Sequence, residues 1–148
     1  MKKTVPFLFL LLLQGCLTGS WHGDLGTCHE TSSGVYSCVI KVPKYGDGVT
    51  VGADIVHHTE KYTPIKNLRV RITNEESHEI QIAGMSSAIY LNPGESYGFT
   101  VEAGQATKGV DGAYICGFVT AVRVKLDISG EHLDDTTIKI TGSGGYGP

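Results

Sequence analysis

A strict alternation of apolar and polar residues in the second half of the chain constrains the fold more than any other feature. Val122, Val124, Leu126 and Ile128 occupy every second position and are separated by charged side chains. Successive side chains of a β-strand point to opposite faces, so this pattern predicts a strand with one buried face. The same apolar signal extends back to Tyr114 and predicts one long strand over residues 114–128.

Shorter segments with the same period occur along the chain. Leu68, Val70 and Ile72 alternate with Arg69 and Arg71, which again predicts a half-buried strand. Further strands are expected over residues 35–42, 49–56, 80–82, 89–91, 99–101 and 137–141. The chain also contains 20 glycines, and no segment shows an apolar stripe at helical spacing. These observations predict an all-β domain of about eight strands.

The middle of the chain indicates the type of all-β domain. Residues 68–102 contain a strand, an Asn-containing turn, two further short strands, a Pro-Gly-Glu turn and a last strand. This order resembles the centre of immunoglobulin-like or transthyretin-like modules, which implies a single β-sandwich over residues 31–141. A small closed β-barrel is the alternative architecture.

The first residues have the parts of an export signal. A positively charged start is followed by an apolar run over residues 5–13, which is shorter than the ~20 residues of a membrane-spanning helix. Leu13, Gly15 and Cys16 then resemble the lipobox of bacterial lipoproteins. The resemblance covers residues 1–16 and implies that residues 1–15 are a signal peptide. It also implies that Cys16 carries diacylglycerol and an amide-linked acyl chain such as palmitate.

The lipobox resemblance also has implications for location. Leu17 is not the aspartate that retains such lipoproteins at the inner membrane, so we expect an outer-membrane anchor with the domain on the periplasmic face. The alternative is a soluble secreted protein, because Thr18 and Ser20 are small residues at the positions that an ordinary signal peptidase reads.

Composition constrains the partners of the mature chain. Removing residues 1–15 leaves 133 of the 148 residues, and the loss of Lys2 and Lys3 changes the formal net charge from −3 to −5. No cluster of Lys or Arg is visible in the sequence, which argues against nucleic acid as a partner. Residues 16–30 are expected to be a lipidated tether, and the glycine-rich residues 142–148 a flexible tail.

The cysteines predict one disulfide. With Cys16 lipidated, three cysteines remain, and an oxidising compartment favours a bridge between two of them. Cys28 and Cys38 enclose a turn-forming segment and are one expected pair. One alternative pairs Cys116 with Cys28 or with Cys38, another is that no bridge forms, and the sequence leaves these possibilities open.

Metal binding and catalysis find little support in the sequence. His57 and His58 are adjacent, so on a strand they would point to opposite faces, and we interpret them as two solvated side chains. Cys116 lacks the His and Met that would follow it closely in a copper site. Residues 84–88 only approximate a nucleophile elbow and lack its α/β context. We therefore expect no catalytic residues, metal or cofactor.

The expected function is that of a noncatalytic interaction or assembly module in the cell envelope, with a protein partner. The alternative is a periplasmic module that binds or inhibits a soluble target such as a hydrolase or a carbohydrate. Binding residues are expected in loops. The first candidate is a loop over residues 104–112 with Gln105, Thr107 and Lys108, and the second is residues 45–48.

Overall fold

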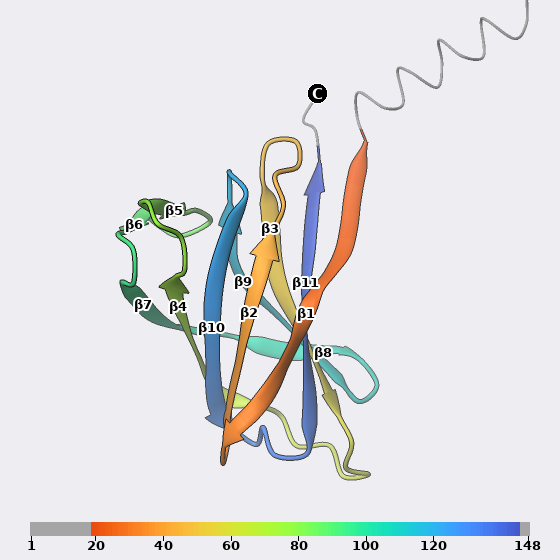
Figure 1. Ribbon diagram of the computed structural model, residues 1–148. Coiled ribbons are helices and arrows are strands. Elements are labelled where there is room, and N and C mark those ends of the chain that lie inside the picture. The colour runs from red at the N-terminus through yellow and green to blue at the C-terminus, as the bar shows by residue number, and fades with distance from the viewer. Residues whose placement is uncertain (1–18, 146–148) are drawn as a thin grey trace, which may run out of the picture.

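A computed structural model describes residues 19–145 of the chain, and it contains β-strands and no helix over that range (Figure 1). The prediction of an all-β fold is confirmed. The strands are β1 (Ser20–Ser32), β2 (Val35–Val42), β3 (Val49–His57), β4 (Lys66–Asn74), β5 (Ile80–Ile82), β6 (Ile89–Leu91), β7 (Ser96–Val101), β8 (Ala103–Thr107), β9 (Val110–Phe118), β10 (Val122–Glu131) and β11 (Thr136–Gly145).

Nine of these strands form one curled antiparallel sheet in the order β7-β4-β10-β2-β1-β11-β3-β9-β8, and β5 and β6 form a separate hairpin. The sheet curls because β1 changes partner along its length. Residues 20–28 pair with β11, and residues 29–32 pair with β2. A bulge at Leu25, next to Gly26 with its φ of 142°, bends the strand between these two roles. The result resembles a half-barrel.

The opposite side of the half-barrel is crossed by the chain itself. β7 and β8 are the two ends of the strand order, yet only Glu102 separates them in sequence. The β5–β6 hairpin lies over the same side, where the backbone of Ala83 exchanges hydrogen bonds of 2.8 and 2.9 Å with Gly117 of β9. The open side of the half-barrel is therefore closed by the chain crossing and by the β5–β6 hairpin.

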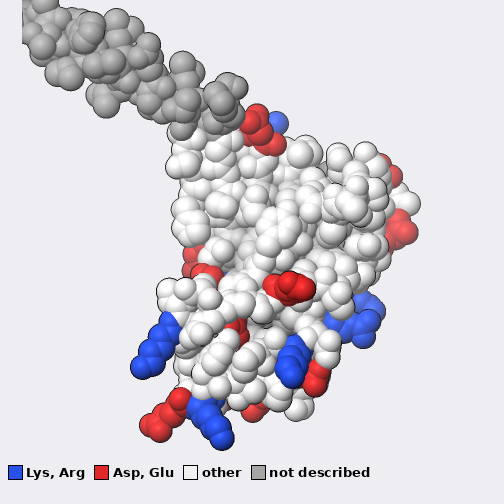
Figure 2. Space-filling view, turned by 180° about the vertical axis from the view of Figure 1, so that it is seen from behind, with Lys and Arg blue, Asp and Glu red and all other residues white. Residues whose placement is uncertain are grey.

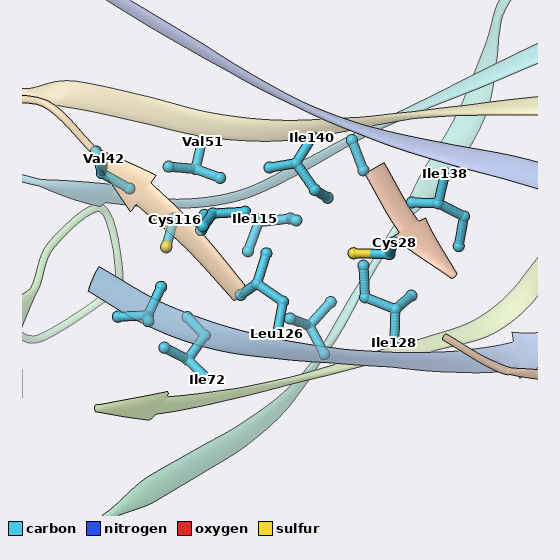
Figure 3. Packing of buried hydrophobic residues seen from close by; sticks show 14 of the residues in the cluster. Cys28, Val42, Val51, Ile72, Ile115, Cys116, Leu126, Ile128, Ile138 and Ile140 are labelled. Carbon is cyan, nitrogen blue, oxygen red and sulfur yellow. The ribbon is translucent and has the colours of Figure 1, made fainter. Parts of the chain in front are cut away.

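The core lies between the two halves of the curled sheet, as Figure 3 shows. Leu126 and Ile72 come from β10 and β4, and Ile55 and Ile140 come from β3 and β11, and all four are fully buried. Each buried Leu or Ile contributes about 1.5–3 kcal/mol by leaving water. The alternating pattern of the sequence therefore identifies the inner face of β3, β4, β10 and β11 correctly.

The prediction of one long strand over residues 114–128 is wrong. The segment divides into β9 and β10, which lie in different halves of the sheet and are joined by residues 119–121. Phe118 and Val122 flank this connection and are both buried. They are four residues apart, which is an even number. The alternation of buried and exposed residues therefore keeps its phase across the turn, and the two strands look like one in the sequence. This extra break is one reason for eleven strands in place of the expected eight.

Most of the expected tether and part of the expected flexible tail belong to the sheet. Residues 20–30 of the expected tether lie in β1, and residues 142–145 of the expected tail lie in β11. The glycines there make room for Trp21, because a Cβ on Gly142 would lie 3.0 Å from the Trp21 ring, which itself packs 6.0 Å from the ring of Tyr45. Residues 16–18 and 146–148 lie outside the described residues.

Candidate functional site

The first predicted binding segment is a projecting hairpin and not a loop. Gln105 and Thr107 lie in β8, and Lys108 lies in the turn that leads to β9. β8 is the last strand of the sheet and pairs only with β9 among the described strands, so its outer edge is open (Figure 1). All of its residues except Ala103 are exposed. The structure thus places the three predicted binding residues together on one sheet edge.

A buried cluster of polar side chains supports the base of this hairpin. Asp111 of β9 is 1 % exposed, and its carboxylate accepts hydrogen bonds from His57 Nε2 at 2.8 Å and from Tyr62 Oη at 2.6 Å. The His57 and Tyr62 rings meet edge to face, with their centroids 5.2 Å apart. A buried carboxylate requires such donors, because desolvation without them is costly.

The electrostatics of the cluster favour a neutral phenol. The hydrogen bond to Asp111, followed by burial and by the negative charge of the same carboxylate, raises the pKa of Tyr62 above its usual 10.0. Tyr62 therefore remains a hydrogen-bond donor at neutral pH. His57 Nε2 faces a carboxylate oxygen, which accepts, so this nitrogen carries the proton.

Hydrogen bonds from His57 and His58 connect the end of β3 to two neighbouring segments. The His57 N–H donates to the carbonyl of Gly109 in the hairpin turn at 2.9 Å. The His58 N–H donates to the carbonyl of Asp135, at 3.0 Å, and its ring contacts the Thr137 hydroxyl at 2.6 Å. The hairpin base is therefore fixed by both side-chain and backbone hydrogen bonds.

The interpretation of His57 as a solvated residue is wrong, since its side chain is only 4 % exposed. His58 is exposed, and the two side chains point in different directions, as expected for neighbours on a strand. The signal for His57 was present in the sequence. It continues the buried alternation of Val51, Ala53 and Ile55 along β3.

The cysteine pairing is resolved. Cys28 and Cys38 form a disulfide with a Cα–Cα distance of 4.5 Å, and the bridge joins β1 to β2 close to the point where β1 changes partner. The alternative bridges through Cys116 are therefore wrong. Cys116 is a buried free thiol (Figure 3), and burial raises its pKa to about 12. A thiol that is protonated and buried is a poor nucleophile.

The second predicted binding segment lies at the other end of β3. Residues 45–48 form a tight turn in which the Gly48 N–H donates to Tyr45 O at 3.0 Å, and the Asp47 N–H donates to Gly145 O at 3.1 Å. The turn thus packs beside the start of β1 and the end of β11, where the two ends of the described chain meet.

The expectations about a nucleophile elbow, metal binding and a membrane anchor concern other parts of the chain. Ser86 and Ser87 are exposed in the connection between β5 and β6. Within residues 19–145, no three His, Cys, Asp or Glu side chains are grouped so that they could bind a metal ion. Over the same residues, no helix has the length and apolar character needed to cross a membrane. Cys16 lies outside the described residues.

No protein-family model, curated protein or solved structure matches the chain.

Proposed function

We propose that this chain is a noncatalytic envelope lipoprotein whose β-domain binds a protein partner through the open edge of β8. The anchor is Cys16, and the leader that precedes it supports this assignment through its charged start, its short apolar run and its Leu-x-Gly-Cys ending. The domain itself supports a binding role through the hairpin described above. The proposed location is the periplasmic face of the outer membrane.

The observation that carries this proposal is the open edge of β8. Backbone N–H and C=O groups on the outer edge of a last strand are available to pair with a strand from another chain. Gly104 and Ala106 are small and exposed, so a partner backbone can approach closely. The buried His57–Asp111–Tyr62 cluster holds the hairpin in place before binding, which reduces the conformational entropy lost on association.

The position of the anchor is compatible with this use of the hairpin. Three residues separate Cys16 from the first residue of β1, so the start of β1 would lie within about 15 Å of the lipid surface. That end of the domain carries residues 45–48, whereas the hairpin turn pairs with the far end of β3. The hairpin would therefore project away from the membrane. In the alternative, a soluble secreted form, cleavage would fall after Ser20. That form would keep all of β1 except its first residue.

For the fold, we propose the finer class of an immunoglobulin-like or transthyretin-like sandwich. The support is the division of the curled sheet into two halves, β7-β4-β10-β2 and β11-β3-β9-β8, whose inner faces enclose one core. β1 would then be the strand that passes from one sheet of the sandwich to the other.

Metabolic labelling tests the anchor. Cells that express the full chain are grown with a palmitate analogue, and the label is followed on the protein. We expect labelling of the wild type and none of Cys16→Ser, with Cys116→Ser as the matched control that keeps its label. Persistent labelling of Cys16→Ser would refute the lipoprotein assignment.

Affinity capture tests the binding surface. Gln105→Ala, Thr107→Ala and Lys108→Ala are combined, and Asp111 is left intact because it is structural. Ser32→Ala with Ser33→Ala, at the exposed tip of the β1–β2 hairpin, is the control. We expect the first variant alone to lose an envelope protein that the wild type captures. Capture of a single soluble hydrolase would instead favour an inhibitory module.

A further inference from the structure

A stripe of basic side chains crosses the outer face of β2, β4 and β10. Twelve Lys and Arg residues occur in the chain, and Lys2 and Lys3 precede the described residues. Half of the remaining ten lie on this one face. The cationic stripe consists of Arg69, Arg71, Arg123, Lys125 and Lys41. The sequence showed no cluster of Lys or Arg, and strand pairing creates this one.

The strand register sets the spacing of the stripe. Asp127 lies opposite Arg71, Lys125 lies opposite Thr73 of the same strand, and Arg123 lies opposite Lys41. Reading along the strands, the order is therefore Arg69, Arg71, Lys125 and then the Arg123–Lys41 pair. Each step is two residues, or about 7 Å, so the stripe extends over about 20 Å. A linear array of this kind fits an extended ligand better than a compact one.

The stripe is only partly neutralised by the protein itself. Asp127 lies among these cations, and Glu131, exposed at the end of β10, accepts a hydrogen bond from the Asn67 side chain. Glu76 accepts a hydrogen bond from the backbone N–H of Arg123 at 2.8 Å. Within the described part of the chain, both pairs that meet a 4.0 Å ion-pair distance involve His, and neither involves a Lys or Arg. Five cations therefore lie beside three carboxylates, in a domain that is acidic overall.

Two grooves lie along the stripe. The larger, of about 550 Å³, is lined by Arg69, Arg71, Asp127 and Ser129 and lies over Gly98, which has no side chain to fill it. The smaller, of about 280 Å³, is lined by Lys41, Arg123, Glu76 and neighbouring apolar residues at the other end. Small hydroxyl side chains, such as Ser129, lie between the charged ones.

The opposite face of the domain has a different character. Figure 2 shows the domain from behind, where the upper part is largely uncharged and the lower part carries interspersed basic and acidic side chains. The outward side chains of β11 and β3 there are mainly Thr, Ser and Gly, with Lys139 and Asp54 opposite each other. Basic and acidic side chains are thus interspersed on this face, whereas the stripe gathers five cations along three paired strands.

We propose that the cationic stripe binds an extended carboxylated polysaccharide. Arg and Lys pair with carboxylates that recur along such a polymer, and the hydroxyl side chains between them can bond to sugar hydroxyls. The outward positions of β2, β4 and β10 hold no aromatic side chain, and Phe99 of β7, which lines the larger groove, is half-buried and stacked on Tyr97. Binding of single-stranded nucleic acid uses aromatic stacking, and the cores of protein interfaces are rich in aromatic residues, so both fit this face less well.

Fluorescence anisotropy with labelled polygalacturonate oligosaccharides tests this proposal on the full chain. We expect binding that weakens as salt rises toward about 0.15 M, because screening shortens the reach of surface charges. Arg71→Gln with Lys125→Gln should weaken binding about tenfold and lower the salt dependence. The control, Lys61→Gln with Lys139→Gln, makes the same charge change away from the stripe and should bind like the wild type. Thermal unfolding confirms that each variant folds.

Three results would overturn the proposal: no binding by the wild type at low salt, equal weakening in the control variant, or binding of single-stranded oligothymidylate as tight as that of polygalacturonate. The stripe shares no residue with the β8–β9 hairpin. Loss of polysaccharide binding with partner capture intact, or the reverse, therefore separates this proposal from the proposed function.

Discussion

Replacing Asp111 with Ala tests whether the buried cluster holds the hairpin base. The substitution removes the acceptor of both the His57 Nε2 bond and the Tyr62 hydroxyl bond. The side chains of His57 and Asp111 are only 4 % and 1 % exposed, so water does not replace the lost partner readily. A buried hydrogen-bonding group that is left without its partner costs about 1–3 kcal/mol. We expect a decrease of that size in the free energy of unfolding.

Urea unfolding, followed by far-ultraviolet circular dichroism, measures this decrease. Domains of this size have a total stability of about 5–15 kcal/mol, so Asp111→Ala should still fold. With a denaturant slope of about 1.5 kcal/mol per molar urea, the midpoint should fall by about 0.7–2 M. Asp54→Ala is the matched control, because it removes an exposed carboxylate from β3, and it should change stability by less than about 0.5 kcal/mol. If Asp111→Ala were as stable as Asp54→Ala, the structural role of the cluster would be refuted.

Three further predictions follow from the fold. Replacing Cys28 and Cys38 with Ala should lower the free energy of unfolding by ~2–3 kcal/mol, because the bridge closes a short loop in the unfolded chain, and an unchanged urea midpoint would contradict this. Gly144→Ala should destabilise by about 1–3 kcal/mol, because its Cβ would lie 2.8 Å from a carbonyl oxygen, whereas Gly104→Ala meets open space and should not. Ultraviolet absorbance is measured against pH for the wild type and for Tyr62→Phe. The difference between the two titration curves should show one phenol that ionises above pH 10. Because its pKa is raised in the folded state, its contribution to stability is complete below pH 10 and is lost above.

Some of the fold was readable from the sequence because the signal is local. The alternation of Leu68, Val70 and Ile72 marks an inner face, and those residues are buried as expected. The short turn between Cys28 and Cys38 favoured this pair, and the alternatives were a bridge through Cys116 or no bridge. In contrast, β1 was missed because the bulge at Leu25 shifts its phase and because its small polar residues resemble a linker.

The polar cluster and the cationic stripe depend on pairing between distant strands. His57 and Asp111 are 54 residues apart in sequence, and they meet only because β3 pairs with β9. Arg71 and Lys125 become neighbours only through the register of β4 and β10. No local pattern specifies such a register, so neither feature could be predicted from the sequence.

Site-specific photocrosslinking in intact cells tests the central claim most directly. A photoreactive amino acid is placed at Gln105 on the open edge of β8, and a second variant carries it at Thr50, an exposed position of β3 that lies away from this edge. The proposal predicts that a discrete crosslinked envelope protein forms from position 105 and not from position 50, in the membrane fraction. Equal crosslinking from both positions, or none from position 105, would contradict a partner site at the β8 edge.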